Sequence, residues 1–268
     1  MKLLNGLELA AFIKERQAKE VRSLKQAHNI LPKLAIVQTK DDQVINTYVR
    51  LKQRYGADIG IDVELFNCKQ NEAKDLVDSL NTNQSIHGII VQLPLQDPKQ
   101  TDEIVNMVSA NKDVDALGDQ PAYDPATPMA ILWLLAGYNV ELKNKKIVLI
   151  GRGKLVGAPL EKILNTAGYD VEVIGRGVTE LKRHTIKADI IITATGSPAI
   201  LYPDMIKRDA VVVDAGVASE SGKTVGDLAP EVYQRDDLTI TPQKGGVGPL
   251  TVCALFENVI RAARQTKD

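Results

Sequence analysis

The sequence predicts an α/β protein of two lobes, with a parallel sheet in each lobe and a helix closing the chain. Three observations predict this class. Short apolar runs alternate with longer amphipathic segments, which is typical of parallel strands and their crossover helices. A glycine turn directly follows one apolar run near the middle of the chain. The length of 268 residues is sufficient for two ordinary domains.

The first half of the chain begins with an amphipathic helical pattern over residues 6–28, which Pro32 closes. The elements that we expect next are strand 33–39, helix 42–57, strand 62–68, helix 71–81, strand 88–95 and helix 99–110. The strands are nearly continuous in apolar residues, which indicates a sheet covered on both faces.

The second half follows a polar loop, 111–124, and a helix that starts near Pro125–Pro128. The elements that we expect next are strand 146–150, helix 156–167, strands 170–174, 188–196, 210–216 and 238–242, and a closing helix at 250–264. Two such halves predict a cleft between lobes, with ligands at the carboxyl ends of the strands.

Gly151, Arg152 and Gly153 form the glycine turn between a strand and a helix. Backbone N–H groups and the positive end of a helix dipole meet at such a turn, which suits a pyrophosphate. The spacing through Gly157 is G-x-G-x-x-x-G, and ordinary strand–helix turns share it. We expect a Rossmann-type dinucleotide-binding domain over residues 125–249. An N-terminal α/β substrate domain would cover residues 1–124 and be completed by the C-terminal helix 250–268.

The residues after the second strand of this domain favour NADP over NAD. NAD-binding units usually place Asp or Glu there to hold the ribose, whereas this strand ends at Ile174 and continues Gly175-Arg176-Gly177. Arg152 supplies a second guanidinium, and two arginines can bind a 2′-phosphate bidentately. The alternative is that both arginines are solvated loop residues.

Polar residues of the first half are candidates for acid–base chemistry and substrate binding. Tyr48 and Lys52 are four positions apart in a predicted helix, so their side chains project from one face. A lysine shielded from bulk solvent beside a phenol loses its proton more readily. Gln92 ends the third strand, and Asp113 and Asp115 follow in the polar loop. The alternative for each residue is a solvated surface group or a helix cap.

Composition excludes several classes of function. The net charge of −1 leaves no basic surface of the kind that binds nucleic acid or anionic membranes. No apolar run approaches the roughly 18 residues of a membrane span. Two cysteines in apolar surroundings and the lack of a signal-peptide pattern favour reduced thiols in a cytoplasmic protein. The three histidines show no metal-ligand spacing, so we expect no metal.

Seven segments together resemble the bifunctional methylenetetrahydrofolate dehydrogenase/methenyltetrahydrofolate cyclohydrolase family. In order they are TYVRLK, GIIVQLPL, KDVDALG, GRGKLVGAPL, ADIIITATG, VVVDAGV and TPQKGGVGPLTVCALFEN. The resemblance implies a homodimeric cytosolic enzyme of one-carbon metabolism. Such an enzyme oxidises methylene-tetrahydrofolate to methenyl-tetrahydrofolate with NADP and then hydrolyses that product to formyl-tetrahydrofolate.

The resemblance also implies roles for individual residues. Lys52 would be the acid–base residue, and Tyr48 would stack on the folate and help to place Lys52. Gln92 would hydrogen-bond the lysine and depress its proton affinity, while Asp115 would accept hydrogen bonds from the pterin. The residues that would border the folate are Lys244, Gly245, Gly246, Val247 and Gly248. Those that would line the NADP site are Gly151, Arg152, Gly153, Arg176 and Val217.

The chain departs from the family's usual pattern at several positions. Ile45 stands where Ser is usual, Ala116 stands where Gly is usual, and Gln243-Lys244 replaces Val-Pro. Gly153 and Ala158 replace residues that are commonly Ser and Arg. These changes leave the candidate residues whole but alter the expected balance of the two activities. The alternatives are a single-activity relative, a two-lobed dehydrogenase of another small substrate, and a non-catalytic dinucleotide-binding regulator.

Overall fold

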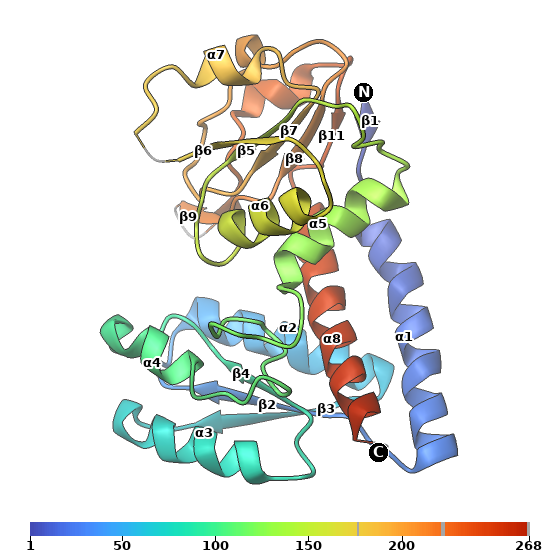
Figure 1. Ribbon diagram of the computed structural model, residues 1–268, viewed down its shortest axis with the longest axis vertical. Coiled ribbons are helices and arrows are strands. Elements are labelled where there is room, and N and C mark those ends of the chain that lie inside the picture. Colours follow the sequence, from blue (N-terminus) through green and yellow to red (C-terminus); the bar gives the residue numbers. More distant parts are fainter. Residues whose placement is uncertain (176, 221–222, 267–268) are drawn as a thin grey trace. The chain divides into compact units, whose positions relative to one another are not determined.

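The computed structural model describes residues 1–175, 177–220 and 223–266 (Figure 1). The chain divides into two compact units. The three-strand unit comprises Ala11–Ala126 and Val252–Asp268, and the six-strand unit comprises Met1–Ala10 and Thr127–Thr251. Each unit has its own parallel sheet, as the alternation of apolar runs predicts. Within the described residues, no helix is long and apolar enough to cross a membrane.

The three-strand unit has β2 at the centre of its sheet, with β3 and β4 as parallel neighbours. Residues 34–37 of β2 are completely buried, which accounts for the unbroken apolar run. Alternate residues of β2, such as Ala35 and Val37, pack with Val77 and Leu80 of α3. The elements of this unit are β2 (Lys33–Gln38), α2 (Gln43–Ile59), β3 (Asp62–Asn67), α3 (Ala73–Thr82), β4 (Gly88–Val91) and α4 (Thr101–Val105). The helices α1 (Gly6–His28) and α8 (Val247–Gln265) contribute residues to both units.

Helix α2 has well-defined ends. Asp42 caps its first turn by accepting hydrogen bonds from the backbone N–H groups of Val44 and Ile45. Gly60 ends the helix with a φ of 84°, a left-handed conformation that glycine adopts readily. The residues that form its buried stripe are Ile45, Val49, Gly56 and Ile59. This stripe fixes the rotation of the helix against the sheet and therefore the direction of its polar residues.

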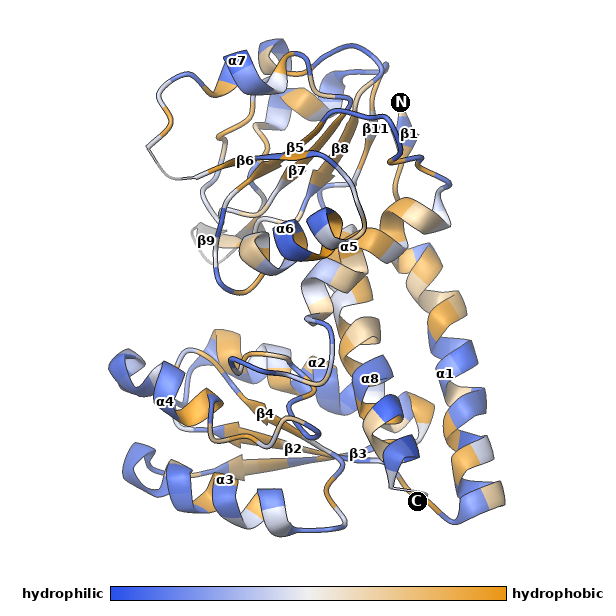
Figure 2. Cartoon of the chain, in the orientation of Figure 1, coloured by the Kyte–Doolittle hydropathy of each residue, from blue (hydrophilic) through white to orange (hydrophobic). Residues whose placement is uncertain are grey.

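The six-strand unit has the strand order β1-β11-β8-β7-β5-β6, with every neighbouring pair parallel. The chain order reverses beside β5, since β6 pairs on one side of it and β7 on the other. This reversal is the switch point where ligands of such sheets bind. Figure 2 shows the hydrophobic colour concentrated on these strands. The elements are β1 (Lys2–Leu3), α5 (Ala126–Gly137), β5 (Ile147–Ile150), α6 (Gly157–Thr166), β6 (Val171–Ile174), α7 (Leu181–Thr185), β7 (Ile190–Thr193), β8 (Val211–Asp214), β9 (Ala218–Glu220), β10 (Lys223–Val225) and β11 (Thr239–Ile240).

Several elements differ from the sequence-based expectation. The sequence pattern did not indicate β1, α7 or the antiparallel pair β9–β10. The start of the chain joins the six-strand unit because β1 pairs with β11 and Leu4 is completely buried. The strands expected at 88–95 and 188–196 are shorter, because the sheet ladders end at Val91 and Thr193. The helix expected at 99–110 is also short, since α4 ends at Val105.

Candidate active site

A lysine and an amide from distant parts of the chain meet in the three-strand unit. Lys52 Nζ donates a hydrogen bond of 2.8 Å to Gln92 Oε1. Gln92 directly follows β4, and its backbone N–H continues the ladder by donating to Val37 O. The Nε2 of Gln92 donates to Leu93 O, which turns the amide oxygen toward the lysine. The sheet and α2 therefore fix both partners.

Burial and one carboxylate set the electrostatics of Lys52. Burial lowers the pKa of the lysine, and attraction to Asp115 opposes this shift. Burial likewise raises the pKa of Asp115, opposed by attraction to Lys52. The role expected of Gln92 in depressing the proton affinity of the lysine needs correction. An amide oxygen that accepts from an ammonium favours the charged form, so burial is what lowers the pKa.

The loop that carries Asp115 is held by a second acid. Asp113 is 3% exposed and accepts hydrogen bonds from the backbone N–H groups of Leu117 and Gly118. Asn258 of α8 donates to Val114 O at 2.9 Å and ties the loop from another side. Asp113 is among the candidates that the sequence pattern indicates, whereas Asn258 is not. A polar residue within the apolar run TVCALFEN of a closing helix is the signal that could have found it.

The other candidate on α2 is less enclosed. Tyr48 projects from the same helix face as Lys52, and its side chain is 41% exposed. Its hydroxyl has no hydrogen-bond partner among the described residues. Ile45 is 4% exposed and belongs to the buried stripe, so the residue at this position contributes packing. The structure thus groups Lys52, Gln92 and Asp115 and leaves Tyr48 open to a ligand.

At the glycine turn of the six-strand unit, Gly151 packs closely against the backbone of Ala194, and Gly157 packs closely against Gly151. Gly151 has a φ of 107°, and a Cβ there would lie 2.4 Å from Ala194 O. A Cβ on Gly157, the first residue of α6, would lie 2.1 Å from Gly151 O. By contrast, Gly153 has no atom within 4 Å of its Cβ position, so a side chain would fit there. The turn and the amino end of α6 fit the pyrophosphate of a dinucleotide.

The arginines expected near a 2′-phosphate are only partly described. Arg152 forms a bidentate ion pair with Glu161 of α6, at 2.8 Å for Nε–Oε2 and 3.2 Å for Nη2–Oε1. Arg176 lies outside the described residues. Val217, three residues after β8, is 60% exposed. Arg152 follows β5 and Val217 follows β8, and both of these strands pair with β7.

The loop expected to border the folate belongs to the six-strand unit by its contacts. A Cβ on Gly6 would lie 1.7 Å from Gly246 O, and one on Gly245 would lie 2.6 Å from Leu7 Cδ1. These close approaches explain the glycines at 245 and 246. Lys244 and Gly248 are exposed, and α8 begins at Val247.

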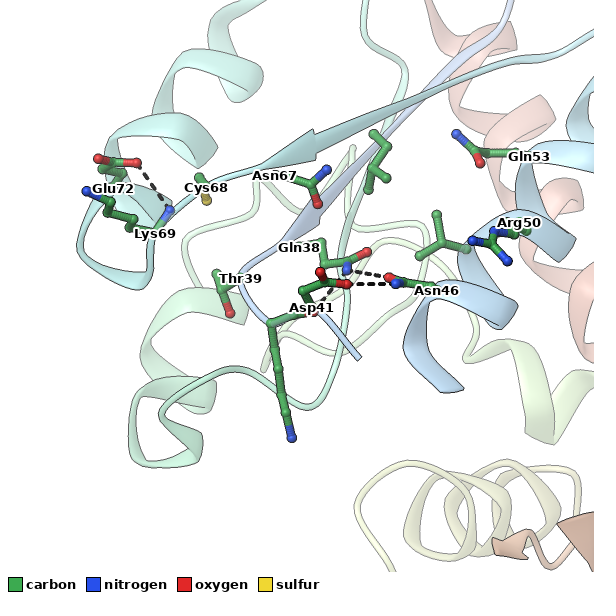
Figure 3. Close-up of a pocket in the computed structure, with 13 residues that line it drawn as sticks. Gln38, Thr39, Asp41, Asn46, Arg50, Gln53, Asn67, Cys68, Lys69 and Glu72 are labelled. Atoms are coloured by element: carbon green, nitrogen blue, oxygen red, sulfur yellow. Dashed lines mark hydrogen bonds between the residues drawn. The ribbon is translucent and has the colours of Figure 1, made fainter. Parts of the chain in front are cut away.

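A pocket of about 710 Å³ opens at the carboxyl ends of β2 and β3 (Figure 3). Gln38, Asn46 and Asp41 form a hydrogen-bonded row on its wall. Asn46 and Gln53 lie on the flank of α2 that is opposite Tyr48 and Lys52, since residues of a helix are about 100° apart. Lys52 and Gln92 do not line this pocket, so it is separate from the candidate active site.

The two parallel sheets and the glycine turn define a class of α/β enzyme with a dinucleotide-binding domain. The chain belongs to the tetrahydrofolate dehydrogenase/cyclohydrolase family. The profile of the family's catalytic domain matches residues 4–115, and that of its NAD(P)-binding domain matches residues 125–267.

Individual relatives agree with this membership. A bifunctional protein FolD from a Nitratiruptor species is 34% identical over 280 residues, covering 100% of this chain and 99% of the relative. The crystal structure of the bifunctional dehydrogenase/cyclohydrolase from Campylobacter jejuni has a TM-score of 0.92 at 35% identity, covering 99% of both chains. The Trypanosoma brucei enzyme, solved with NADP and an inhibitor, has a TM-score of 0.91 at 27% identity, covering 98% of this chain and 97% of that one.

Proposed function

We propose that this protein oxidises 5,10-methylenetetrahydrofolate to 5,10-methenyltetrahydrofolate with NADP and hydrolyses that product to 10-formyltetrahydrofolate. The observation that carries the proposal is the hydrogen bond of the partly buried Lys52 to Gln92, with Asp115 close enough to raise the pKa of the lysine. Family membership over both halves of the chain supports it. The bifunctional dehydrogenase/cyclohydrolase from C. jejuni supports the pairing of the two reactions.

For hydrolysis the protein must supply a proton carrier. It need not activate the carbon that water attacks, because the methenyl cation is already electrophilic. Lys52 would take the proton of the attacking water and return it to a folate nitrogen. Its lowered pKa makes the neutral amine available nearer to physiological pH. Gln92 would keep the amine in one orientation through their 2.8 Å hydrogen bond. Tyr48, exposed on the same helix face, would stack on the substrate.

Asp115 would bind the donor edge of the pterin. A carboxylate whose pKa is raised by burial gains most from a ligand that supplies N–H groups. The loop from Lys244 to Gly248 would border the folate, and the exposed Lys244 could meet its carboxylates. The roles of these residues rest on their positions in the family's motifs together with their burial and charge.

The dinucleotide would lie at the switch point of the six-strand unit. When bound there, NADP would supply the acceptor for the hydride of the folate methylene carbon. Gly151 and the amino end of α6 would hold the pyrophosphate, and Gly153 and Val217 would line the site. Arg152 and Arg176 would select the 2′-phosphate, with Arg152 exchanging its partner Glu161 for the phosphate.

The remaining proposals rest on the family resemblance. The three-strand unit would carry folate chemistry, and the six-strand unit would bind the cofactor. We also propose a homodimer that works in the cytoplasm and supplies formyl groups for purine biosynthesis.

One assay tests the proposed function. Purified protein is mixed with NADP and methylenetetrahydrofolate while the methenyl chromophore, NADPH and the formyl product are followed separately. We expect all three signals, and hydrolysis of added methenyltetrahydrofolate without cofactor. NADPH without the formyl product, or the reverse, would show a single-activity relative. Absence of both reactions with NADP binding retained would show a non-catalytic binder.

A further inference from the structure

Two carboxylates, the completely buried Asp227 and the partly buried Asp214, hold the loops that follow β7 and β8. Asp227 is completely buried and accepts hydrogen bonds from the backbone N–H groups of Thr195, at 2.8 Å, and Ser197, at 3.0 Å. Asp214, the last residue of β8, accepts from the N–H groups of Gly216, at 2.9 Å, and Asp227, at 3.0 Å. Within the described residues, no lysine or arginine forms an ion pair with either acid. Backbone N–H groups, joined at Asp214 by the hydroxyls of Thr193 and Tyr233, therefore compensate these charges.

Two glycines allow this close approach. A Cβ on Gly216 would lie 2.0 Å from Asp227 Oδ1, and a Cβ on Gly226 would lie 2.1 Å from Asp214 Oδ2. Asp227 thus lies against Gly216, two residues after Asp214, and Asp214 lies against Gly226, which directly precedes Asp227. The segments 194–197, 214–217 and 226–228 are interlocked by this arrangement, so displacement of one acid would disturb all three.

The loop that Asp227 holds touches the glycine turn and Val217, which lies three residues after β8. Gly151 packs so closely that its Cβ would lie 2.4 Å from Ala194 O, next to Thr195. A Cβ on Gly196 would lie 3.1 Å from Val217 O. Since β7 lies between β5 and β8 in the sheet, the loop after β7 forms the common wall of both positions.

We propose that Asp227, supported by Asp214, is a positioning residue that sets the affinity for the dinucleotide by holding the loop 194–197 against the glycine turn. The inference rests on the proposed cofactor site. Asp227 is too buried to contact the cofactor and acts through the N–H groups of Thr195 and Ser197. Its loss would therefore affect dinucleotide binding and leave hydrolysis by the three-strand unit in place.

The test compares Asp227→Asn with a substitution at a control carboxylate. Asp227 holds the loop after β7, and the control lies at the opposite end of β7. The amide keeps one acceptor but turns an NH₂ toward the second backbone N–H. Asp189→Asn is the control, because Asp189 precedes β7 and accepts from the N–H of Lys146. For each full-length variant, the Kd of NADP is measured by calorimetry, and the hydrolysis of methenyltetrahydrofolate is measured without cofactor.

We expect Asp227→Asn to raise the Kd of NADP at least about tenfold, because a hydrogen bond to a charged acceptor is lost. Hydrolysis should stay within about twofold of the parent, and Asp189→Asn should change neither quantity by more than that. An unchanged Kd, or an equal fall of binding and hydrolysis, would overturn the inference. If Asp227→Asn does not fold, Asp214→Asn is judged by the same criteria, and failure of both to fold means a purely structural role. A parent protein that binds no NADP would instead refute the proposed function.

Discussion

Lys52 of α2 donates its hydrogen bond to Gln92, the residue directly after β4, at 2.8 Å. The bond joins a helix to the carboxyl end of a parallel strand, where polar groups of such sheets face ligands. Burial lowers the pKa of this lysine although Asp115 attracts its charge. A lysine in these surroundings is suited to moving protons near neutral pH.

Lys52→Ala should reduce hydrolysis of methenyltetrahydrofolate by about 10²- to 10⁴-fold, the range for removal of a general acid–base group. Dehydrogenation should fall less, because hydride transfer depends mainly on alignment. Lys74→Ala is a control, since Lys74 forms only a surface ion pair with Glu103. Separate rates for the two reactions check the prediction. A variant that hydrolyses at the parent rate would exclude Lys52 as the proton carrier.

The pH dependence of hydrolysis should report the lowered pKa of Lys52. If the neutral amine is the active base, the rate rises with pH to a midpoint below 10.5, the ordinary value for lysine. Asp115→Asn should move this midpoint to lower pH, because the carboxylate raises the pKa of the lysine. Asp119→Asn, an exposed acid in the same loop, should leave it in place. A midpoint that rises in Asp115→Asn would contradict the electrostatic account.

The two glycines of the turn should respond differently to an added methyl group. Gly151→Ala should weaken NADP binding strongly, since its Cβ would lie 2.4 Å from Ala194 O and the φ of 107° disfavours alanine. Gly153→Ala should bind NADP within a few-fold of the parent, because its Cβ position is open. Calorimetric titration with NADP measures both. Equal losses in the two variants would show that steric contact does not decide the role of these glycines.

Ala116 has a φ of 55°, in the left-handed region that an alanine enters at a cost of roughly 1–2 kcal/mol. Ala116→Gly should remove this strain, although the more flexible unfolded chain offsets about 0.4–1 kcal/mol. We expect a free energy of unfolding up to about 1 kcal/mol higher, measured by urea denaturation. Ala57→Gly, at an exposed position of α2, should instead lower it by about 0.5–1 kcal/mol. Destabilisation in Ala116→Gly would contradict the strain argument.

Arg176→Ala should raise the Kd of NADP at least about tenfold and change that of NAD little, because only NADP carries the 2′-phosphate. Arg152→Ala should have a smaller effect on NADP, since Arg152 must first leave Glu161. Binding of both cofactors to each variant checks this prediction. Equal losses for NADP and NAD in Arg176→Ala would remove the argument from the missing carboxylate.

Features that depend on near neighbours in the chain follow from the amino-acid sequence alone. Alternating apolar runs determined the parallel sheets, and the glycine spacing determined the turn before α6. The spacing of four residues was sufficient to put Tyr48 and Lys52 on one face of α2. These features follow from backbone preferences and periodicity, which act over a few residues.

Contacts between groups that are distant in the chain became known from the folded arrangement. Gln92 lies 40 positions from Lys52 in the chain, and Arg152 forms its ion pair with Glu161. Likewise, β1 joins the sheet through β11, and Asp227 reaches back to the N–H groups after β7. No local pattern encodes such pairings, because they depend on how sheets and helices pack to bury apolar surface and satisfy buried polar groups.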